Sequence, residues 1–291
     1  MSFPLFLEQL LNGVQLGVML FLMSAGLTLV FGIMNLINLA HGSLYMLGAF
    51  IAAAVAKTTG SFLLGAAVAI PATALVGGIL EFGLLRRFYG RSHLDQVLVT
   101  FGLVLVFNEI VRLIWGSVPL RFSLPQGLDG SVEIWPGVPY PVFRLVILAF
   151  GLVVALMLYL LIMHTRLGMW VRAGASNRAM AGAIGVNVDL VFLGVFSVGA
   201  ALAGLAGVMA GPILAVQVGM GEPILILALV VTVIGGIGSV KGALIAALGI
   251  GIIDTFGRVL LSPALGSMVI FLAMAIILAW RPKGLFPVHG H

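Results

Sequence analysis

Residues 9–56 read QLLNGVQLGVMLFLMSAGLTLVFGIMNLINLAHGSLYMLGAFIAAAVA and contain no Lys, Arg, Asp or Glu. A helix that crosses a lipid bilayer needs about 20 mostly apolar residues, so this run is long enough for two crossings. Three polar residues, Asn35, Asn38 and His41, interrupt it. The stretch therefore predicts two membrane-spanning helices that are separated by a break around these three residues.

The rest of the chain has the same apolar character. Of the 291 residues, 62% are hydrophobic and 8% are charged, whereas soluble domains average about 25% charged residues. So few charges cannot cover the surface of a globule in water. We therefore predict a single all-α domain over residues 1–291, a polytopic transmembrane helix bundle with about eight to ten spans.

Other apolar segments place the remaining spans, at about 58–80, 96–115, 142–163, 189–212, 224–254 and 266–280. Glycines interrupt the fifth of these segments at 235–239. Residues 227–244 also align with residues 27–44, and each copy is an apolar run, a break and a second apolar run. Repeats with such breaks occur in transporters near the substrate path, so broken or re-entrant helices are expected here.

Small residues recur at every fourth position in two of the predicted spans. The two rows are Gly199, Ala203, Gly207 and Gly211, and Gly235, Ser239, Ala243, Ala247 and Gly251. Helices in lipid associate by close van der Waals contact, which small residues allow. The rows predict a tightly packed bundle with internal surfaces.

The basic residues of the loops predict the orientation. They form three groups: Arg86, Arg87 and Arg91; Arg166, Arg172 and Arg178; Arg281 and Lys283. Basic loops favour the cytoplasmic side of a membrane. We therefore expect the N-terminus outside and the C-terminus inside. The Pro- and Gly-rich loop at 116–140 then faces outward, and its composition predicts turns and little regular structure.

The sequence lacks the motifs of an enzyme. It contains no GxxxxGK[ST] phosphate-binding loop, no HExxH pair and no cysteine. Its net charge of +5 is accounted for by the loop residues beside apolar segments, not by a nucleic-acid-binding surface. We predict no catalytic residue, no metal site, no cofactor and no nucleic-acid partner. A nucleotide-binding site must come from another chain.

The loop at 164–189 reads HTRLGMWVRAGASNRAMAGAIGVNVD. Its middle, from Asn177 to Ile184, has small and apolar residues at spacings that suit a short helix, and Gly185 suits the C-terminal stop. Such a helix with an alanine-rich face fits a groove on a partner protein. The residues assigned to this docking loop are Arg172, Ala173, Asn177, Met180, Ala181 and Gly185. The alternative is an ordinary connecting loop with arginines that fix the topology.

The two breaks form the second candidate site. Its residues are Asn35, Asn38, His41, Gly235, Gly236 and Gly238. Unpaired polar groups are costly in hydrocarbon, so these positions must face protein or a water-filled path. They either line a pathway or form structural breaks that are hydrogen-bonded to neighbouring helices. For Asn35, Asn38 and His41 we favour the structural interpretation over direct contact with a solute.

Several stretches, in order along the chain, carry a likeness to a known family. They are Gly26–Met34, Asn38–Ser43 and Met46–Ala49; Thr165–Gly168 with Arg172-Ala173, Met180-Ala181 and Gly185–Val188; Ala200–Val208; Val233–Ala243; and Arg281–Phe286. With them the chain resembles the permeases of branched-chain amino acid importers of the ABC class, and the loop at 164–189 resembles their coupling loop. The chain departs from the family at Ser176-Asn177-Arg178, where many members carry an acid.

The resemblance implies a multi-pass subunit of the inner (cytoplasmic) membrane that translocates branched-chain or related amino acids. It also implies the partners: two ABC ATPase subunits, a second related permease subunit, an extracytoplasmic solute-binding protein and membrane lipid. Permeases for urea, short amides or sugars have a similar scaffold. An ion-coupled secondary transporter is the alternative from another class, and it would require a buried ionisable cluster in mid-span.

Overall fold

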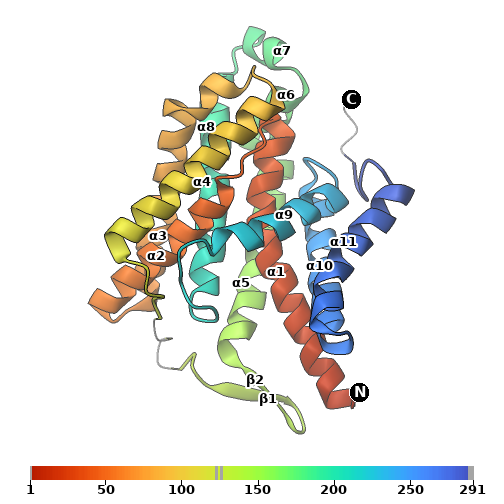
Figure 1. Cartoon of the computed structure of the whole chain (residues 1–291). Helices are drawn as coiled ribbons and strands as arrows, with labels where there is room; N and C mark the ends of the chain where they lie inside the picture. Colours follow the sequence, from red (N-terminus) through yellow and green to blue (C-terminus); the bar gives the residue numbers. More distant parts are fainter. Residues whose placement is uncertain (1, 122–123, 125–126, 288–291) are drawn as a thin grey trace.

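The computed structural model describes residues 2–121, 124 and 127–287. The helices are α1 (Phe3–Met34), α2 (His41–Thr59), α3 (Phe62–Gly83), η1 (Leu85–Phe88), α4 (His93–Trp115), α5 (Val142–His164), α6 (Arg166–Ser176), α7 (Arg178–Ala183), α8 (Val188–Ala210), α9 (Gly221–Gly235), α10 (Val240–Leu260) and α11 (Pro263–Trp280). The strands are β1 (Ser131–Trp135) and β2 (Val138–Pro141). Figure 1 shows them as a bundle with its long helices roughly along one axis.

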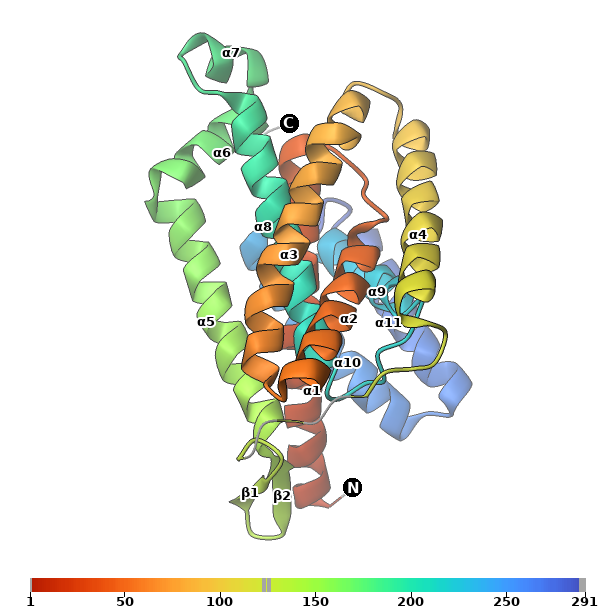
Figure 2. The same cartoon turned by 90° about the vertical axis from the view of Figure 1, so that its left-hand side faces the viewer.

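In the described part of the chain, seven helices are long and apolar enough to cross a membrane: α1, α2, α3, α4, α5, α8 and α10. Two shorter apolar helices, α9 and the Met268–Trp280 part of α11, add to them. The prediction of a polytopic helical bundle with about eight to ten spans is therefore confirmed. Figure 2 shows α4 and α5 on opposite flanks of this bundle.

The start of α1 and the β1–β2 hairpin lie at one end of the bundle, and α6 and α7 lie at the other (Figures 1 and 2). In the expected topology, which stays a prediction, the first of these ends faces outward and the basic loops face the cytoplasm. We therefore refer to the hairpin end as the outer end and to the α7 end as the cytoplasmic end.

The expectation of little regular structure at 116–140 is wrong for its last part. Strands β1 and β2 pair antiparallel, with Ser131 opposite Pro141 and Val132 opposite Tyr140. The turn between them contains Pro136 and Gly137, and a proline followed by a glycine with positive φ is a good turn sequence. The Glu133 carboxylate also accepts a hydrogen bond from the Gly137 amide at 2.6 Å.

Helix α1 lies at the centre of the core, and small residues let other helices approach it closely. A Cβ atom added at Gly26 would lie 2.6 Å from the carbonyl oxygen of Gly199 on α8. One added at Gly17 would lie 2.8 Å from the carbonyl oxygen of Ala247 on α10. The predicted rows of small residues are therefore packing faces, because Gly199 and Ala247 belong to them.

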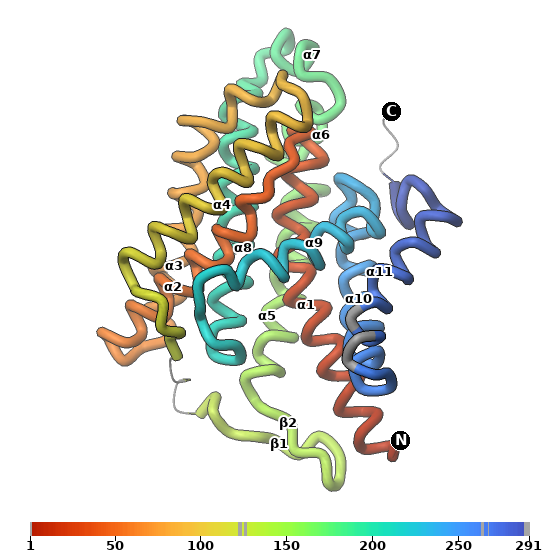
Figure 3. The backbone as a smooth tube through the Cα atoms, viewed as in Figure 1, coloured from red at the N-terminus to blue at the C-terminus, as the bar shows by residue number. Residues whose placement is uncertain are grey.

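The two breaks are each followed by a helix that returns toward the outer end. In Figure 3, α1 runs along the bundle to its break, whereas α9 crosses the bundle to reach its break, and α2 and α10 then run back toward the outer end. The chain segments 35–40 and 236–239 form the two breaks. Each copy of the weak sequence repeat, at 27–44 and 227–244, therefore contains the end of one helix, a break and the start of the next helix.

Candidate functional site

The loop between α5 and α8 consists of two short helices at the cytoplasmic end. Thr165 caps α6 by accepting a hydrogen bond from the Gly168 amide, and Asn177 caps α7 by accepting one from the Met180 amide at 2.9 Å. Gly185 follows α7 with a φ of +89°, which favours glycine. The short helix expected within 177–184 is present as α7. The sequence interpretation did not include α6.

The residues assigned to the docking loop differ in their exposure. Met180 is 62% exposed and its neighbour Ile184 is 71% exposed, so α7 presents an apolar surface at its tip. Ala181 is 2% exposed and faces the protein's own interior. Asn177 and Gly185 are exposed, and Ala173 is half-buried. The exposed Arg172 has its guanidinium turned back to the carbonyl oxygen of Ile162.

Arg178, the first residue of α7, connects this loop to the first helix break. Its Nη2 donates a hydrogen bond of 2.8 Å to the carbonyl oxygen of Met34, the last residue of α1. Its guanidinium carbon lies 4.6 Å from the ring centroid of Phe192 and 5.6 Å from that of Tyr89. A planar guanidinium can stack and donate at the same time, so Arg178 fixes α7 to the end of α1.

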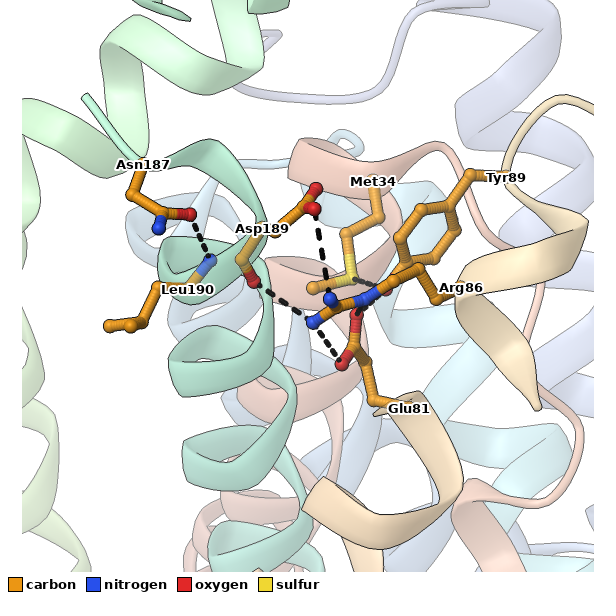
Figure 4. Close-up of polar contacts among 7 residues, drawn as sticks. All are labelled: Met34, Glu81, Arg86, Tyr89, Asn187, Asp189 and Leu190. Carbon is orange, nitrogen blue, oxygen red and sulfur yellow. Dashed lines mark hydrogen bonds and ion pairs between the residues drawn. The ribbon is translucent and has the colours of Figure 1, made fainter. Parts of the chain in front are cut away.

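A buried carboxylate, Glu81, binds Tyr89 and Arg86 (Figure 4). Glu81 on α3 is 0% exposed and accepts hydrogen bonds from Arg86 Nε at 3.2 Å, Arg86 Nη2 at 3.0 Å and the Tyr89 hydroxyl at 2.6 Å. Arg86 Nη2 also donates to the carbonyl oxygen of Asp189 at 3.3 Å. These contacts join the cytoplasmic ends of α3 and α8, and the buried charge is paired as its burial requires.

The same cluster shifts two pKa values. Burial of the Tyr89 hydroxyl, together with its hydrogen bond to the Glu81 carboxylate, raises the pKa of Tyr89. The hydrogen bond from Arg86 to Glu81 raises the pKa of the Arg86 guanidinium. Tyr89 therefore stays a neutral donor and Arg86 a cation, which is the protonation state that the three-residue cluster needs.

The break after α1 is an extended segment that α4 holds. Asn35 adopts a left-handed conformation with a φ of 52° and ends α1. The amide of Ile37 donates to Gln96 Oε1 at 3.2 Å, and the carbonyl oxygen of Ile37 accepts from Thr100 Oγ1 at 3.4 Å. Side chains of α4 thus satisfy backbone groups that no helix satisfies, as non-helical backbone in a membrane requires.

Two predicted residues of this break keep unpartnered polar atoms. Both side-chain amide atoms of Asn38 are buried without a hydrogen-bond partner. His41 Nε2 contacts the carbonyl oxygen of Met23 at 3.2 Å, whereas His41 Nδ1 has no partner. The first break is therefore only partly satisfied by the protein around it.

The break after α9 is held by the C-terminal segment. The amide of Leu285 donates to the carbonyl oxygen of Ile234 at 2.8 Å, and the amide of Phe286 donates to that of Gly235 at 3.1 Å. A Cβ atom added at Gly236 would lie 2.9 Å from the carbonyl oxygen of Phe286. The predicted residues Gly235 and Gly236 thus lie against residues 284–286. Both segments belong to stretches that carry the family resemblance in the sequence, Val233–Ala243 and Arg281–Phe286.

Helix α1 brings the second break close to the first. A Cβ atom added at Gly32 would overlap the Cα atom of Gly238. One turn earlier, Thr28 Oγ1 donates to Thr232 Oγ1 at 3.1 Å. The end of α1 is therefore in contact with both breaks and, through Arg178, with α7.

Known proteins resemble this chain over most of its length. A family model described as "Branched-chain amino acid transport system / permease component" matches residues 9–278. The high-affinity branched-chain amino acid transport system permease protein LivH of Salmonella typhimurium is 30% identical over an alignment that covers 98% of this chain and 96% of LivH. The corresponding protein BraD of Pseudomonas aeruginosa is 30% identical over 96% of this chain and 95% of BraD.

A relative with a different named solute is also similar. The ribose import permease protein RbsC of Escherichia coli is 28% identical over 89% of this chain and 80% of RbsC. No solved structure matches the chain at a significant level.

Proposed function

The chain belongs to the family of branched-chain amino acid transport permease components, and from this premise we propose how it works and with what. It is a multi-pass permease of the inner membrane. We propose that it forms the translocation pathway with a second, related permease subunit, that two ABC ATPase subunits drive it, and that an extracytoplasmic binding protein delivers branched-chain or related amino acids.

The contact between α7 and the end of α1 supports the proposed coupling. The exposed apolar side chains of Met180 and Ile184 suit a groove on an ATPase, since exposed apolar groups at a loop tip gain from burial. Arg178, at the other end of α7, contacts Met34 directly before the first break. A displacement of α7 by the ATPase is therefore passed to the break between α1 and α2.

Ala181 has a different role in this proposal from the one that the sequence suggests. Its side chain is buried within the chain, so it supports the position of α7 and does not enter the partner. Met180 and Ile184 take the docking role. The composition of the chain supports a separate energy source, because the sequence contains no phosphate-binding loop of the GxxxxGK[ST] type.

The test uses the importer reconstituted from all its subunits in proteoliposomes. We expect ATP-dependent uptake of leucine by the unaltered complex. We expect the double substitution Met180→Asp with Ile184→Asp to lower ATPase co-purification and uptake by about tenfold or more, because charges would enter an apolar contact. Val132→Asp, at an exposed apolar position of the outer hairpin, is the matched control and should keep ATPase binding.

The outcomes separate the proposal from its alternatives. Normal ATPase binding and uptake by the double variant would remove α7 from the coupling. Uptake that follows an ion gradient without ATP would identify a secondary transporter. Uptake of ribose but not leucine would favour the sugar alternative, which the likeness to RbsC supports.

A further inference from the structure

Four basic residues lie around the cytoplasmic end of α5 without a partner of opposite charge. They are His164, the last residue of α5, Arg166 and Arg172 on α6, and Lys241 in the first turn of α10. All four are exposed. Within the described part of the chain, no carboxylate lies within ion-pair distance of any of them.

The acids near this end of the bundle do not supply the missing charge. Glu81 and Asp189 are both paired with Arg86, at 3.0 and 3.7 Å. Asp95 lies in the first turn of α4, which is on the opposite flank from α5 (Figure 2). The positive charge beside α5 is therefore not compensated by the described residues, and it favours an anion from outside the chain.

An aromatic ring of α5 holds Lys241 at this corner. Lys241 Nζ lies 4.9 Å from the ring centroid of Tyr159. The ring of His164 lies edge-on to the same tyrosine, with the two centroids 5.7 Å apart. The face of an aromatic ring attracts a cation, and an ammonium group still has three N–H donors for an acceptor. Tyr159 thus brings two basic side chains together and leaves their donors available.

The place of Lys241 in its helix also favours a nearby anion. Lys241 is the second residue of α10, where the helix dipole is positive and disfavours a cation. Arg172 adds to the positive charge, because its guanidinium is turned to the carbonyl oxygen of Ile162 in the last turn of α5. A negatively charged group beside Lys241 would offset both the dipole and these side chains.

The corner lies near the end of an apolar span, where lipid headgroups are found. Tyr159 precedes the end of α5 at His164 by five residues, and a helix rises 1.5 Å per residue, so its Cα atom lies about 7.5 Å from that end. Tyrosine is enriched at this level of membrane proteins, and long lysine side chains extend toward the headgroups. The cytoplasmic leaflet contains anionic lipids, which basic residues at this level attract.

The surfaces beside the basic residues are apolar. Leu156 and Met163 precede and follow Tyr159 by three and four residues, so they share its face of α5, and both are exposed. Ile245, one turn after Lys241 on the same face of α10, is exposed as well. A soluble anion gains nothing from such surfaces, whereas the acyl chains of a lipid lie against them.

We propose that an anionic phospholipid of the cytoplasmic leaflet binds at this corner, between the end of α5 and the start of α10. Its phosphate binds Lys241 and His164, and its acyl chains lie along Leu156 and Ile245. The lipid thereby connects α5 to the second break, because Lys241 follows that break directly. The site does not depend on the transported solute or on the energy source.

The first experiment measures lipid binding to the full-length chain, purified in detergent with the subunits that accompany it. Native mass spectrometry detects the bound molecules as phosphatidylglycerol, phosphatidylcholine or glycerol phosphate is added. We expect phosphatidylglycerol to bind roughly fivefold or more tightly than phosphatidylcholine, because only phosphatidylglycerol has a net negative charge. Glycerol phosphate has the charge without the acyl chains, and we expect it to bind far more weakly than phosphatidylglycerol.

Substitutions then assign the binding to the corner. Lys241→Gln removes one charge, and we expect roughly a fivefold loss of phosphatidylglycerol affinity, the usual contribution of one basic residue near anionic lipid. Lys241→Arg keeps the charge and should keep most of the binding. Arg87→Gln removes an exposed charge of η1, between α3 and α4. It is the matched control and should bind as the unaltered chain does.

The second experiment locates the acyl chains in proteoliposomes. Since the chain has no cysteine, Ile245→Cys introduces a single thiol in this subunit for a fluorescent label. We expect phosphatidylglycerol with brominated acyl chains to quench this label more strongly than brominated phosphatidylcholine does. Adding Lys241→Gln should abolish the difference. Leu105→Cys, at an exposed apolar position of α4, is the control and should be quenched equally by both lipids.

Each contrary result has a definite meaning. Equal binding of the two lipids would refute the site. A loss for Arg87→Gln as large as that for Lys241→Gln would show that the attraction is spread over the cytoplasmic end and would refute it too. Glycerol phosphate that binds as tightly as phosphatidylglycerol would identify a site for a soluble phosphate and overturn the lipid assignment. None of these measurements requires uptake, so they are distinct from the test of the proposed function.

Discussion

The two breaks of the helix bundle are built in different ways. The first, at 35–40, is held by side chains of α4, and it retains unpartnered polar atoms at Asn38 and His41. The second, at 236–239, is held by backbone hydrogen bonds from the C-terminal segment and by glycine contacts with α1. The first break contacts α7 through Arg178, whereas the second contacts residues 284–286.

The difference suggests a division of roles. Backbone-to-backbone hydrogen bonds and glycine contacts leave little room for displacement, because the close-packed atoms have no side chains that can rotate. Side-chain hydrogen bonds can exchange partners, and unpaired polar groups can accept water. We therefore infer that the second break is a fixed support and that the first is the part that changes during transport.

The largest effect is expected where α1 rests on the fixed break. Gly32→Ala would place a methyl group on the Cα atom of Gly238, which is backbone and cannot turn aside. We expect a loss of about 3 kcal/mol, the upper part of the range for overpacking, and a clear fall in the thermal unfolding midpoint in detergent.

Gly249→Ala is the matched control for that substitution. Gly249 is a helical glycine on α10 with no heavy atom near its added Cβ, so its substitution should be neutral or slightly stabilising. If Gly32→Ala has the same thermal unfolding midpoint as the control, the second break can be displaced as readily as the first.

A smaller loss is expected from removing the support of the first break. Gln96→Leu would leave the amide of Ile37 without its partner, while the carbonyl oxygen of Phe88 would keep only its hydrogen bond from the Arg91 amide. Buried unpaired groups cost about 1–3 kcal/mol, so we expect about 2 kcal/mol. The measurement is again thermal unfolding, with Gln9→Leu near the N-terminus of α1 as the control. If water replaces Gln96 without loss, the two variants will unfold at the same temperature.

Arg178→Gln tests whether the first break is connected to the ATPase side. The substitution removes the charged hydrogen bond to Met34 and the stacking on Phe192. We expect uptake per ATP hydrolysed to fall about tenfold, equivalent to about 1.4 kcal/mol, while ATPase association persists through Met180 and Ile184. Arg178→Lys should recover little, because a lysine cannot stack as a plane. A normal uptake-to-hydrolysis ratio for Arg178→Gln would show that coupling bypasses α1.

Much of the fold could be predicted because its signals are local. An uncharged run such as 9–56 is visible in any window of the sequence, and its polar interruption coincides with the end of α1 and the start of α2. Helix α7 could be predicted for the same reason, since Asn177 and Gly185, which mark its two ends, lie close to it in the sequence.

The rest depends on contacts between residues far apart in the chain. Arg86 and Tyr89 are near Glu81 in the sequence, but the contact between Arg86 and Asp189 forms only because α3 packs against α8. The burial of the Ala181 side chain depends on how α7 packs against the rest of the chain. The hydrogen bond between Asn108 and Glu222 depends in the same way on the position of α9. The one sequence signal that could have found Glu81 and Glu222 is their position as acids directly at the end or the start of an apolar run.

The smallest effect concerns the cap of α10 in the second break. Ser239 Oγ accepts a hydrogen bond from the Gly242 amide at 3.1 Å and is buried. Ser239→Ala should cost about 1 kcal/mol, as cap removal usually does. Ser92→Ala, which removes the exposed cap of α4, should cost less, because water replaces the lost hydroxyl there. Equal shifts of the unfolding midpoint would mean that water also reaches Gly242, and the second break would then be as hydrated as the first and no more fixed.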